Sequence, residues 1–223
     1  MRARPGRFSV ADELPADQPD VQWPAVADED LRHGIHRLIT AVVELGGAVG
    51  WVDIPQRAAT DAWLDQALAA APGGLAIVRR AGEVQALGAW AADTGVHAHV
   101  ATLSKVMAHP KARGHGLGRL VLTELLQAAA EAGMEIAVLG VRGNNHAAIA
   151  LYESVGLRVW GVVPNGIAVG AERFDDVRMV RQLALPADAV LRGQQAGGLG
   201  GSHRRLSAQL PSAQLPSAQL PSQ

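Results

Sequence analysis

Two arginines and three glycines stand close together near the middle of the chain. They are Arg113, Gly114, Gly116, Gly118 and Arg119. Glycines let an anion approach the backbone, and guanidinium groups suit phosphate oxygens. The apolar stretch 96–107 precedes this turn, and a helical pattern over 117–132 follows it. A strand, a glycine-rich turn and a helix in this order predict a phosphate site, because the free N–H groups at a helix start attract anions.

Two common phosphate-binding patterns do not fit this turn. A dinucleotide fingerprint counted from Gly114 would need a third glycine where Arg119 stands. A nucleotide P-loop needs a lysine followed by serine or threonine, and neither Lys105 nor Lys111 has such a neighbour. A surface turn that binds no ligand is the structural alternative.

Two segments resemble the motifs of a known family. Arg113-x-x-Gly116-x-Gly118 is similar to the [QR]-x-x-G-x-[GA] pattern of the GCN5-related N-acetyltransferases, the GNAT superfamily. The preceding Val106-x-Ala108-x-Pro110 resembles the strand end that leads into that pattern. Further along, the chain resembles the family segment N-x-x-A-x-x-L-Y-x-x-x-G-F through Asn145-x-x-Ala148-x-x-Leu151-Tyr152-x-x-x-Gly156-Leu157. Only Leu157 departs, because the family has an aromatic residue there.

The resemblance implies direct transfer of an acetyl group from acetyl-CoA to an amine. It assigns the pyrophosphate of this co-substrate to the turn residues Arg113, Gly114, His115, Gly116, Leu117, Gly118 and Arg119. It assigns the pantetheine arm and the thioester carbonyl to the backbone of Val106, Met107 and Ala108.

Two further site residues follow from the second motif. Tyr152, the only tyrosine in the chain, stands where family members often have the group that protonates the leaving thiolate. Its structural alternative is an aromatic residue in the core. Asn145 either contacts the cofactor or only caps the following helix.

The group that removes the proton from the amine stays open. Family members often use a glutamate on the long strand, and residues 96–107 contain none. His97, His99 and Ser104 are the candidates there, although both histidines are expected near the strand's start. The weaker candidates are Glu44, Asp53 and Glu83, while His109 and His115 are expected to face phosphate or solvent.

The acceptor site is predicted around the loop 48–55. Trp51 and Asp53 combine an aromatic face with an acid, which suits a cationic amine, and packing is the alternative role. This segment resembles GNAT proteins of the tabtoxin resistance type. We therefore expect a small-molecule amine as substrate, in a detoxification or resistance role. The alternatives are a protein or peptide acceptor, and an acyl-CoA-binding sensor without turnover.

Composition limits the other functions. The 223 residues are 48% hydrophobic, carry a formal net charge of −1 and include no cysteine. The balanced charge gives no reason to expect nucleic acid or a membrane surface as partner. We expect no metal site, because histidine and acidic residues lack ligand spacing. The default expectation is a cytoplasmic bacterial protein, and a homodimer is neither indicated nor excluded.

The element pattern predicts an α/β (α+β) fold. We expect a single GNAT-fold domain over 21–185, with a mixed, mostly antiparallel, splayed sheet and helices on both faces. Residues 1–20 and 186–223 are predicted to be disordered, the latter with a repeated Ser-Ala-Gln-Leu-Pro sequence. Strands are expected at 21–26, 75–80, 84–92, 96–107, 135–141, 157–163 and 173–183. Helices are expected at 28–45, 55–71, 117–132 and 145–156, and a turn at 164–166.

Overall fold

The computed structural model describes residues 19–47 and 49–183. The predicted disordered segments, 1–20 and 186–223, lie outside this part of the chain except for residues 19 and 20. The helices are α1 (Glu29–Glu44), α2 (Arg57–Ala69), α3 (Leu117–Glu131) and α4 (His146–Ser154). The strands are β1 (Asp20–Gln22), β2 (Gly73–Arg80), β3 (Glu83–Ala92), β4 (Val100–Ala108), β5 (Ile136–Arg142), β6 (Arg158–Val169) and β7 (Glu172–Gln182).

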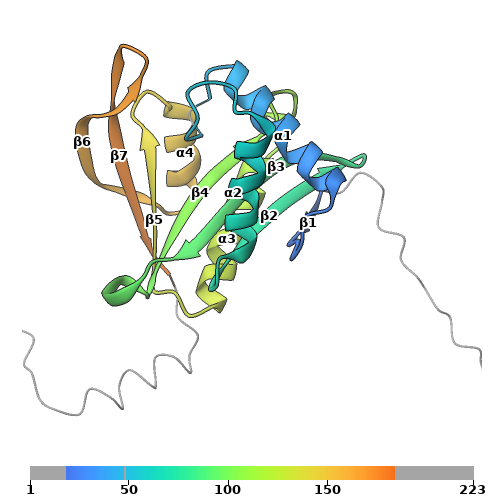
Figure 1. Cartoon of the computed structure of the whole chain (residues 1–223). Helices are drawn as coiled ribbons and strands as arrows, with labels where there is room; N and C mark the ends of the chain where they lie inside the picture. The colour runs from blue at the N-terminus through green and yellow to red at the C-terminus, as the bar shows by residue number, and fades with distance from the viewer. Residues whose placement is uncertain (1–18, 48, 184–223) are drawn as a thin grey trace, which may run out of the picture.

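All the strands belong to one seven-stranded sheet (Figure 1). Their order is β1-β2-β3-β4-β5-β7-β6. Only β4 and β5 run parallel, and every other neighbouring pair is antiparallel. The predicted mixed, mostly antiparallel sheet is therefore confirmed.

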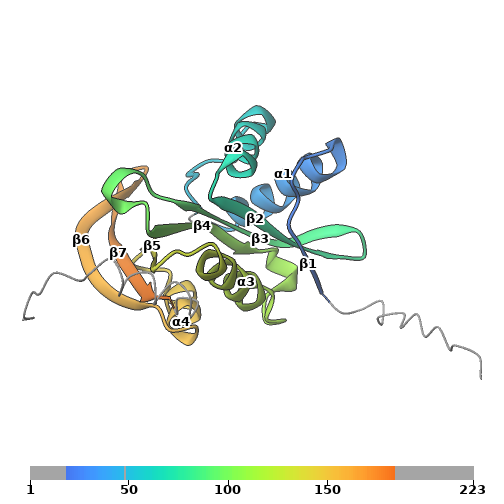
Figure 2. The same ribbon diagram turned by 90° about the horizontal axis from the view of Figure 1, so that it is seen from below.

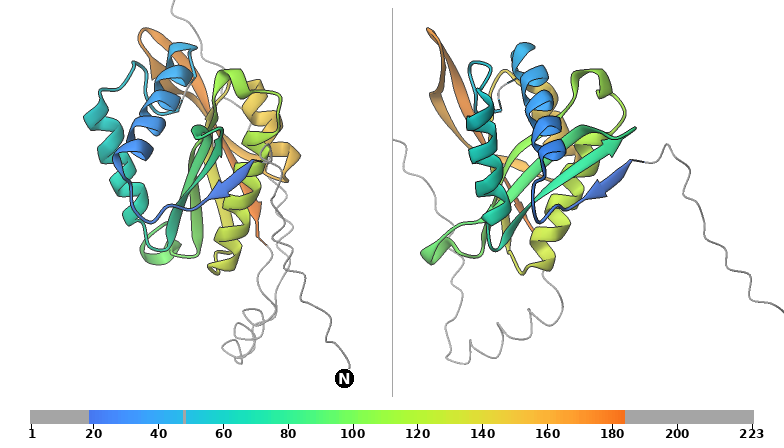
Figure 3. Two further views of the ribbon diagram at one scale, coloured as in Figure 1. Left: turned by 90° about the vertical axis from the view of Figure 1, so that its right-hand side faces the viewer. Right: turned by 45° about the vertical axis from the view of Figure 1, so that its right-hand side comes forward.

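Helices cover both faces of the sheet, as Figures 2 and 3 show from two directions. Helices α1 and α2 pack on one face around buried residues such as Leu38, Leu64 and Leu87. Helices α3 and α4 cover the other face around residues such as Leu125 and Met179. The sheet is thus the middle layer between two apolar cores.

Local chemistry explains where several elements begin and turn. The Asp28 carboxylate accepts a hydrogen bond of 2.8 Å from the Leu31 N–H, which caps α1 as its acidic start predicts. Ala81 and Gly82 connect β2 to β3 with φ values of 50° and 78°. Two positive φ angles are what a tight two-residue hairpin requires.

The sheet splits open between β4 and β5. Their pairing is confined to Val100–Thr102 against Ile136–Val138, so both strands continue beyond it without pairing to each other. Farther along β4, Lys105 and Val106 together oppose Gly88 on β3, which makes a β-bulge. Lys105 has φ 56°, a conformation that side chains rarely adopt.

The structure corrects three predicted boundaries. The first strand is shorter than predicted and ends before Pro24, whose ring nitrogen has no hydrogen to donate. The long strand begins at Val100, because residues 95–97 form a 3₁₀ turn. The turn predicted at 164–166 is wrong: these residues lie inside β6, at a shift in register against β7.

Gly88 gives a test of how tightly α3 packs on the sheet. A Cβ at Gly88 would lie 2.7 Å from Leu125 Cδ1 and 2.9 Å from Val121 Cγ1, and both of these side chains are fully buried. We expect Gly88→Ala to lower the free energy of unfolding by about 1–3 kcal/mol in denaturant titrations. Gly161→Ala is the matched control, because nothing lies within 4 Å of its Cβ position. Equal stabilities of the two variants would contradict this packing.

Candidate active site

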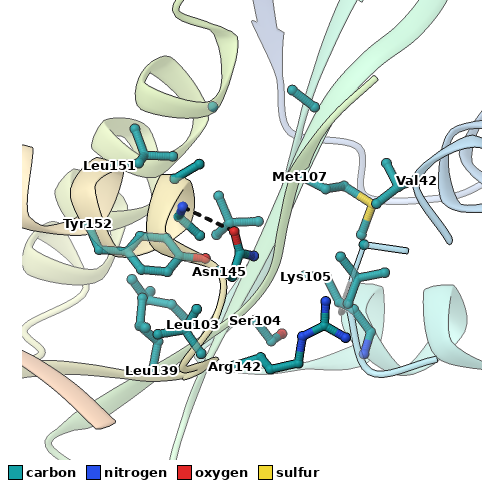
Figure 4. Close-up of a pocket in the computed structure, with 18 of the residues that line it drawn as sticks. Val42, Leu103, Ser104, Lys105, Met107, Leu139, Arg142, Asn145, Leu151 and Tyr152 are labelled. Atoms are coloured by element: carbon teal, nitrogen blue, oxygen red, sulfur yellow. Dashed lines mark hydrogen bonds between the residues drawn. The ribbon is translucent and has the colours of Figure 1, made fainter. Parts of the chain in front are cut away.

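A pocket of about 880 Å³ occupies the opening between β4 and β5. Its walls extend from Val42 on α1 to Tyr152 on α4, so it reaches both faces of the sheet. Figure 4 shows Tyr152 and Asn145 on one side of β4, and Val42 and Lys105 on the other. The unpaired ends of the two strands therefore create the site.

The glycine-rich turn forms one end of this pocket. Gly114 and Gly116 have φ values of 81° and 77°, where a side chain would be strained. Gly116 is the N-cap of α3, and the first turn of that helix contains no acidic residue. The N–H groups of its first residues therefore remain free to bind an anion. This turn could hold a pyrophosphate.

Most of the predicted site residues line the same pocket. They are Val106, Met107, Ala108, Arg113, Gly114, Gly116, Leu117, Gly118, Arg119, Asn145 and Tyr152. His115 is not in the walls, and its Nδ1 lies 3.1 Å from the Arg113 carbonyl oxygen. The structure therefore brings the two motifs together but leaves His115 outside.

The two residues predicted to bind the acceptor amine do not lie in the same pocket. Trp51 lines a second pocket of about 240 Å³, which shares Gly46, Gly47, Gly50, Arg142 and Ile167 with the main one. Asp53 is exposed and lines neither pocket.

Tyr152 and Asn145 present polar groups from α4. Tyr152 is only 8% exposed, and its side chain points into the pocket (Figure 4). Burial raises the pKa of its phenol to about 12, so the hydroxyl keeps its proton near neutral pH. The Asn145 Oδ1 accepts a hydrogen bond of 3.2 Å from the Ala148 N–H, so this side chain does cap α4. Asn145 also lines the pocket, which leaves the predicted contact with the cofactor as a prediction.

Four charged residues of the pocket were missed in the sequence. They are Lys105 on β4, Arg142 on β5, and Asp176 and Arg178 on β7. The Arg178 Nη2 lies 2.6 Å from Asp176 Oδ2. Each of the four stands on a strand, and the side of the sheet that it faces depends on register, which no local motif encodes.

Only some of the candidate bases lie in the pocket. Ser104 lines the pocket, whereas His97, His99, Glu44, Asp53 and Glu83 do not. The Glu83 carboxylate instead lies 2.6 Å from Arg37 Nη2. His109 caps a short 3₁₀ turn by accepting a bond of 3.2 Å from the Lys111 N–H. Among the described residues that form the pocket walls, Asp176 is the one with a carboxylate.

Within 19–47 and 49–183, no group of histidine and acidic residues is arranged to hold a metal ion. No helix in this part of the chain is long and apolar enough to cross a membrane.

Comparison with known proteins identifies this architecture. The model of the "Acetyltransferase (GNAT) family" matches residues 48–157, which include the turn and the α4 motif. This segment of the chain belongs to the GNAT family. The structure of yncA, a putative acetyltransferase from Salmonella typhimurium with its cofactor acetyl-CoA, superimposes with a TM-score of 0.66 and 22% identity. That likeness covers 77% of this chain and 97% of the other, and it supports the fold.

Curated relatives of this GNAT chain match over shorter segments. An L-methionine sulfoximine/L-methionine sulfone acetyltransferase from Salmonella typhimurium is 36% identical over 66 residues, 29% of this chain and 39% of that protein. The L-amino acid N-acyltransferase MnaT from Escherichia coli is 36% identical over 59 residues, 26% of this chain and 34% of that protein. The chain therefore spans less than half the length of the curated relatives it matches.

Because Tyr152 is the only tyrosine, its ionisation can be read directly by absorbance at 295 nm. We expect the folded protein to show a tyrosine pKa of about 12, raised by burial. The same chain in denaturant is the control and should titrate near about pH 10. A transition near pH 10 in protein that circular dichroism shows to be folded would contradict the buried position.

The same shift predicts how stability changes with pH. Between pH 10 and about 12 the unfolded chain loses the Tyr152 proton while the folded chain keeps it, so stability falls as pH rises. We expect wild type to lose about 2 kcal/mol more unfolding free energy than Tyr152→Phe across this interval. Denaturant titrations at both limits measure the difference, and parallel losses in the two proteins would count against it.

Proposed function

We propose that this GNAT protein is an acetyl-CoA-dependent N-acetyltransferase that acts on a small-molecule amine. The observation that carries the proposal is the single pocket that joins the free N–H groups of α3 to the buried Tyr152 hydroxyl. The first can hold a pyrophosphate, and the second can supply a proton. A sensor without turnover would need the phosphate site but would have no use for such a proton donor.

The proposed reaction divides among three parts of the pocket. The α3 N–H groups, with Arg113 and Arg119, hold the pyrophosphate of acetyl-CoA. The unpaired backbone of β4 after the bulge pairs with the pantetheine arm and polarises the thioester carbonyl. The amine nitrogen then forms a bond to the carbonyl carbon, the carbon–sulfur bond breaks, and Tyr152 gives its proton to the leaving thiolate. The nitrogen loses its second proton as the amide forms, and this proton restores the Tyr152 phenol directly or through water.

The amine must be unprotonated before it attacks. Asp176 offers a carboxylate in the pocket walls, with a side chain that is 14% exposed. We assign it as the acceptor of the ammonium proton, directly or through one water. Its ion pair with Arg178 holds the carboxylate in a fixed position.

The acceptor class is supported by the curated relatives. Both are named for acyl transfer to amino acids or their analogues, although each matches only part of its length. A pocket that lies between two strands of the sheet suits a small molecule. A protein N-terminus or lysine would instead need a channel wide enough for a peptide.

Thiol release from acetyl-CoA tests this function. We expect a chromogenic thiol reagent to detect turnover with L-methionine sulfone or another amino-acid amine, tested beside polyamines, aminoglycosides and short peptides. The protein has no cysteine and therefore contributes no background. Turnover with peptides alone would replace the small-molecule proposal. Binding of acetyl-CoA without release for any acceptor would favour the sensor.

The Tyr152→Phe variant tests the acid. Phenylalanine keeps the ring that packs against the core and removes only the hydroxyl, so folding should be retained. We expect kcat to fall by about 10²-fold because the thiolate leaves without a proton, while the KM for acetyl-CoA changes little. Steady-state rates and a thermal melt of both proteins measure this. An unchanged kcat would remove Tyr152 from the mechanism.

A further inference from the structure

Lys105 occupies an unusual place in the pocket. It lies on the bulge of β4 with φ 56°, just before the residues assigned to the pantetheine arm. Its Nζ lies 4.3 Å from the ring centre of Trp51, and a Cβ at Gly50 would collide with it. Trp63 supports Trp51 edge-on at 6.0 Å. The strained backbone and the loop before α2 therefore direct this lysine to one position.

Arg142 approaches the same loop from β5. Its Nη2 donates a hydrogen bond of 3.0 Å to the Gly46 carbonyl oxygen, and its Cζ lies 4.8 Å from the ring centre of Phe174. Its Nε is buried and has no hydrogen-bond partner in the described structure. Both Arg142 and Lys105 line the main pocket beside this loop, as Figure 4 shows.

Neither cation is paired with a carboxylate among residues 19–47 and 49–183. Asp176, the carboxylate of the pocket walls, lies against Arg178. Lys105 is half-buried, and the loss of water lowers its pKa. Like charges that share a pocket repel each other, and half-buried donors without acceptors cost free energy. An anion bound between them would relieve both costs.

The cofactor phosphates do not account for these cations. The turn at the start of α3 supplies its own N–H groups together with Arg113 and Arg119. Lys105 and Arg142 instead stand beside Gly46 and Gly50, which also line the small pocket that contains Trp51. They therefore belong to the side from which the acceptor amine enters.

We propose that Lys105 and Arg142 bind the carboxylate of the acceptor, so that the enzyme selects amines that carry an acid group on the neighbouring carbon. In an α-amino acid a single carbon separates the amine from the carboxylate, so an anchored carboxylate holds the amine close to the thioester. Polyamines and aminoglycosides carry only positive charge and are repelled. The proposal rests on the proposed acetyl transfer and names its acceptor class.

The first test compares L-methionine sulfone with its carboxamide, which keeps the amine and loses the anionic charge. The quantity to measure is the ratio of kcat/KM for acid over amide in each protein, because this ratio cancels effects on acetyl-CoA. We expect wild type to prefer the acid, and Lys105→Met to lower the ratio by about 10–100-fold, as for a lost charge-assisted hydrogen bond. Methionine keeps the apolar contact with Trp51.

Two further variants separate charge from packing. Lys105→Arg should retain most of the wild-type ratio, because it keeps a cation on the same backbone. Lys111→Met removes the other lysine of the chain, which is exposed and outside both pockets, and should leave the ratio unchanged. A ratio that is already near one in wild type, or that survives in Lys105→Met, would overturn the proposal.

Calorimetry measures binding without turnover, so it tests the carboxylate site separately from the proposed acetyl transfer. The acid and the amide are titrated into wild type and Lys105→Met, each saturated with CoA. If no acceptor is turned over but wild type binds the acid more tightly and the variant does not, the anion site stands and the proposed transfer fails. If acid and amide bind alike, or neither binds, the anion site is wrong whatever the turnover result.

Discussion

The site depends on the short parallel pairing between β4 and β5. Three residues of each strand pair, Val100–Thr102 with Ile136–Val138, and beyond them each strand is held only by its outer neighbour. A backbone without a partner would normally be costly in the middle of a sheet. Here it faces a pocket, where it can pair with a bound arm of extended shape. One missing strand contact thus provides both the space and the hydrogen-bonding groups of the site.

The bulge at Lys105 adds a second break in regularity. In a regular strand alternate residues face alternate sides, so a lysine between Ser104 and Val106 would have a predictable direction. The extra residue opposite Gly88 disturbs this alternation and places Lys105 against Trp51. Nothing in the local sequence marks the bulge, so the sequence does not indicate Lys105 as a site residue.

The site residues that could be predicted from the sequence lie close to one another along the chain. Gly114, Gly116 and Arg113 stand in one turn, and Asn145 and Tyr152 stand at the start of and within one short helix, so each set could be compared with a family motif. Arg142 and Asp176 lie on β5 and β7, which are distant in the sequence and meet only through strand pairing. They were therefore missed as site residues. The wrongly predicted turn at 164–166 has the same origin. Its residues favour a turn locally, but pairing of β6 with β7 on both sides, and a bond of 3.0 Å from the Asn165 N–H to Asp175, keep them within β6.

The charges of the pocket bear on the problem of the absent glutamate. An ammonium group held near Lys105 and Arg142 stands among like charges, and like charges favour its neutral form. A carboxylate on the same molecule offsets the repulsion for binding, yet the amine still loses its proton more readily than it would in water. The proton of such an ammonium group can therefore pass to a weaker base than would be needed in water. The carboxylate that we propose for this step is Asp176, which is paired with Arg178.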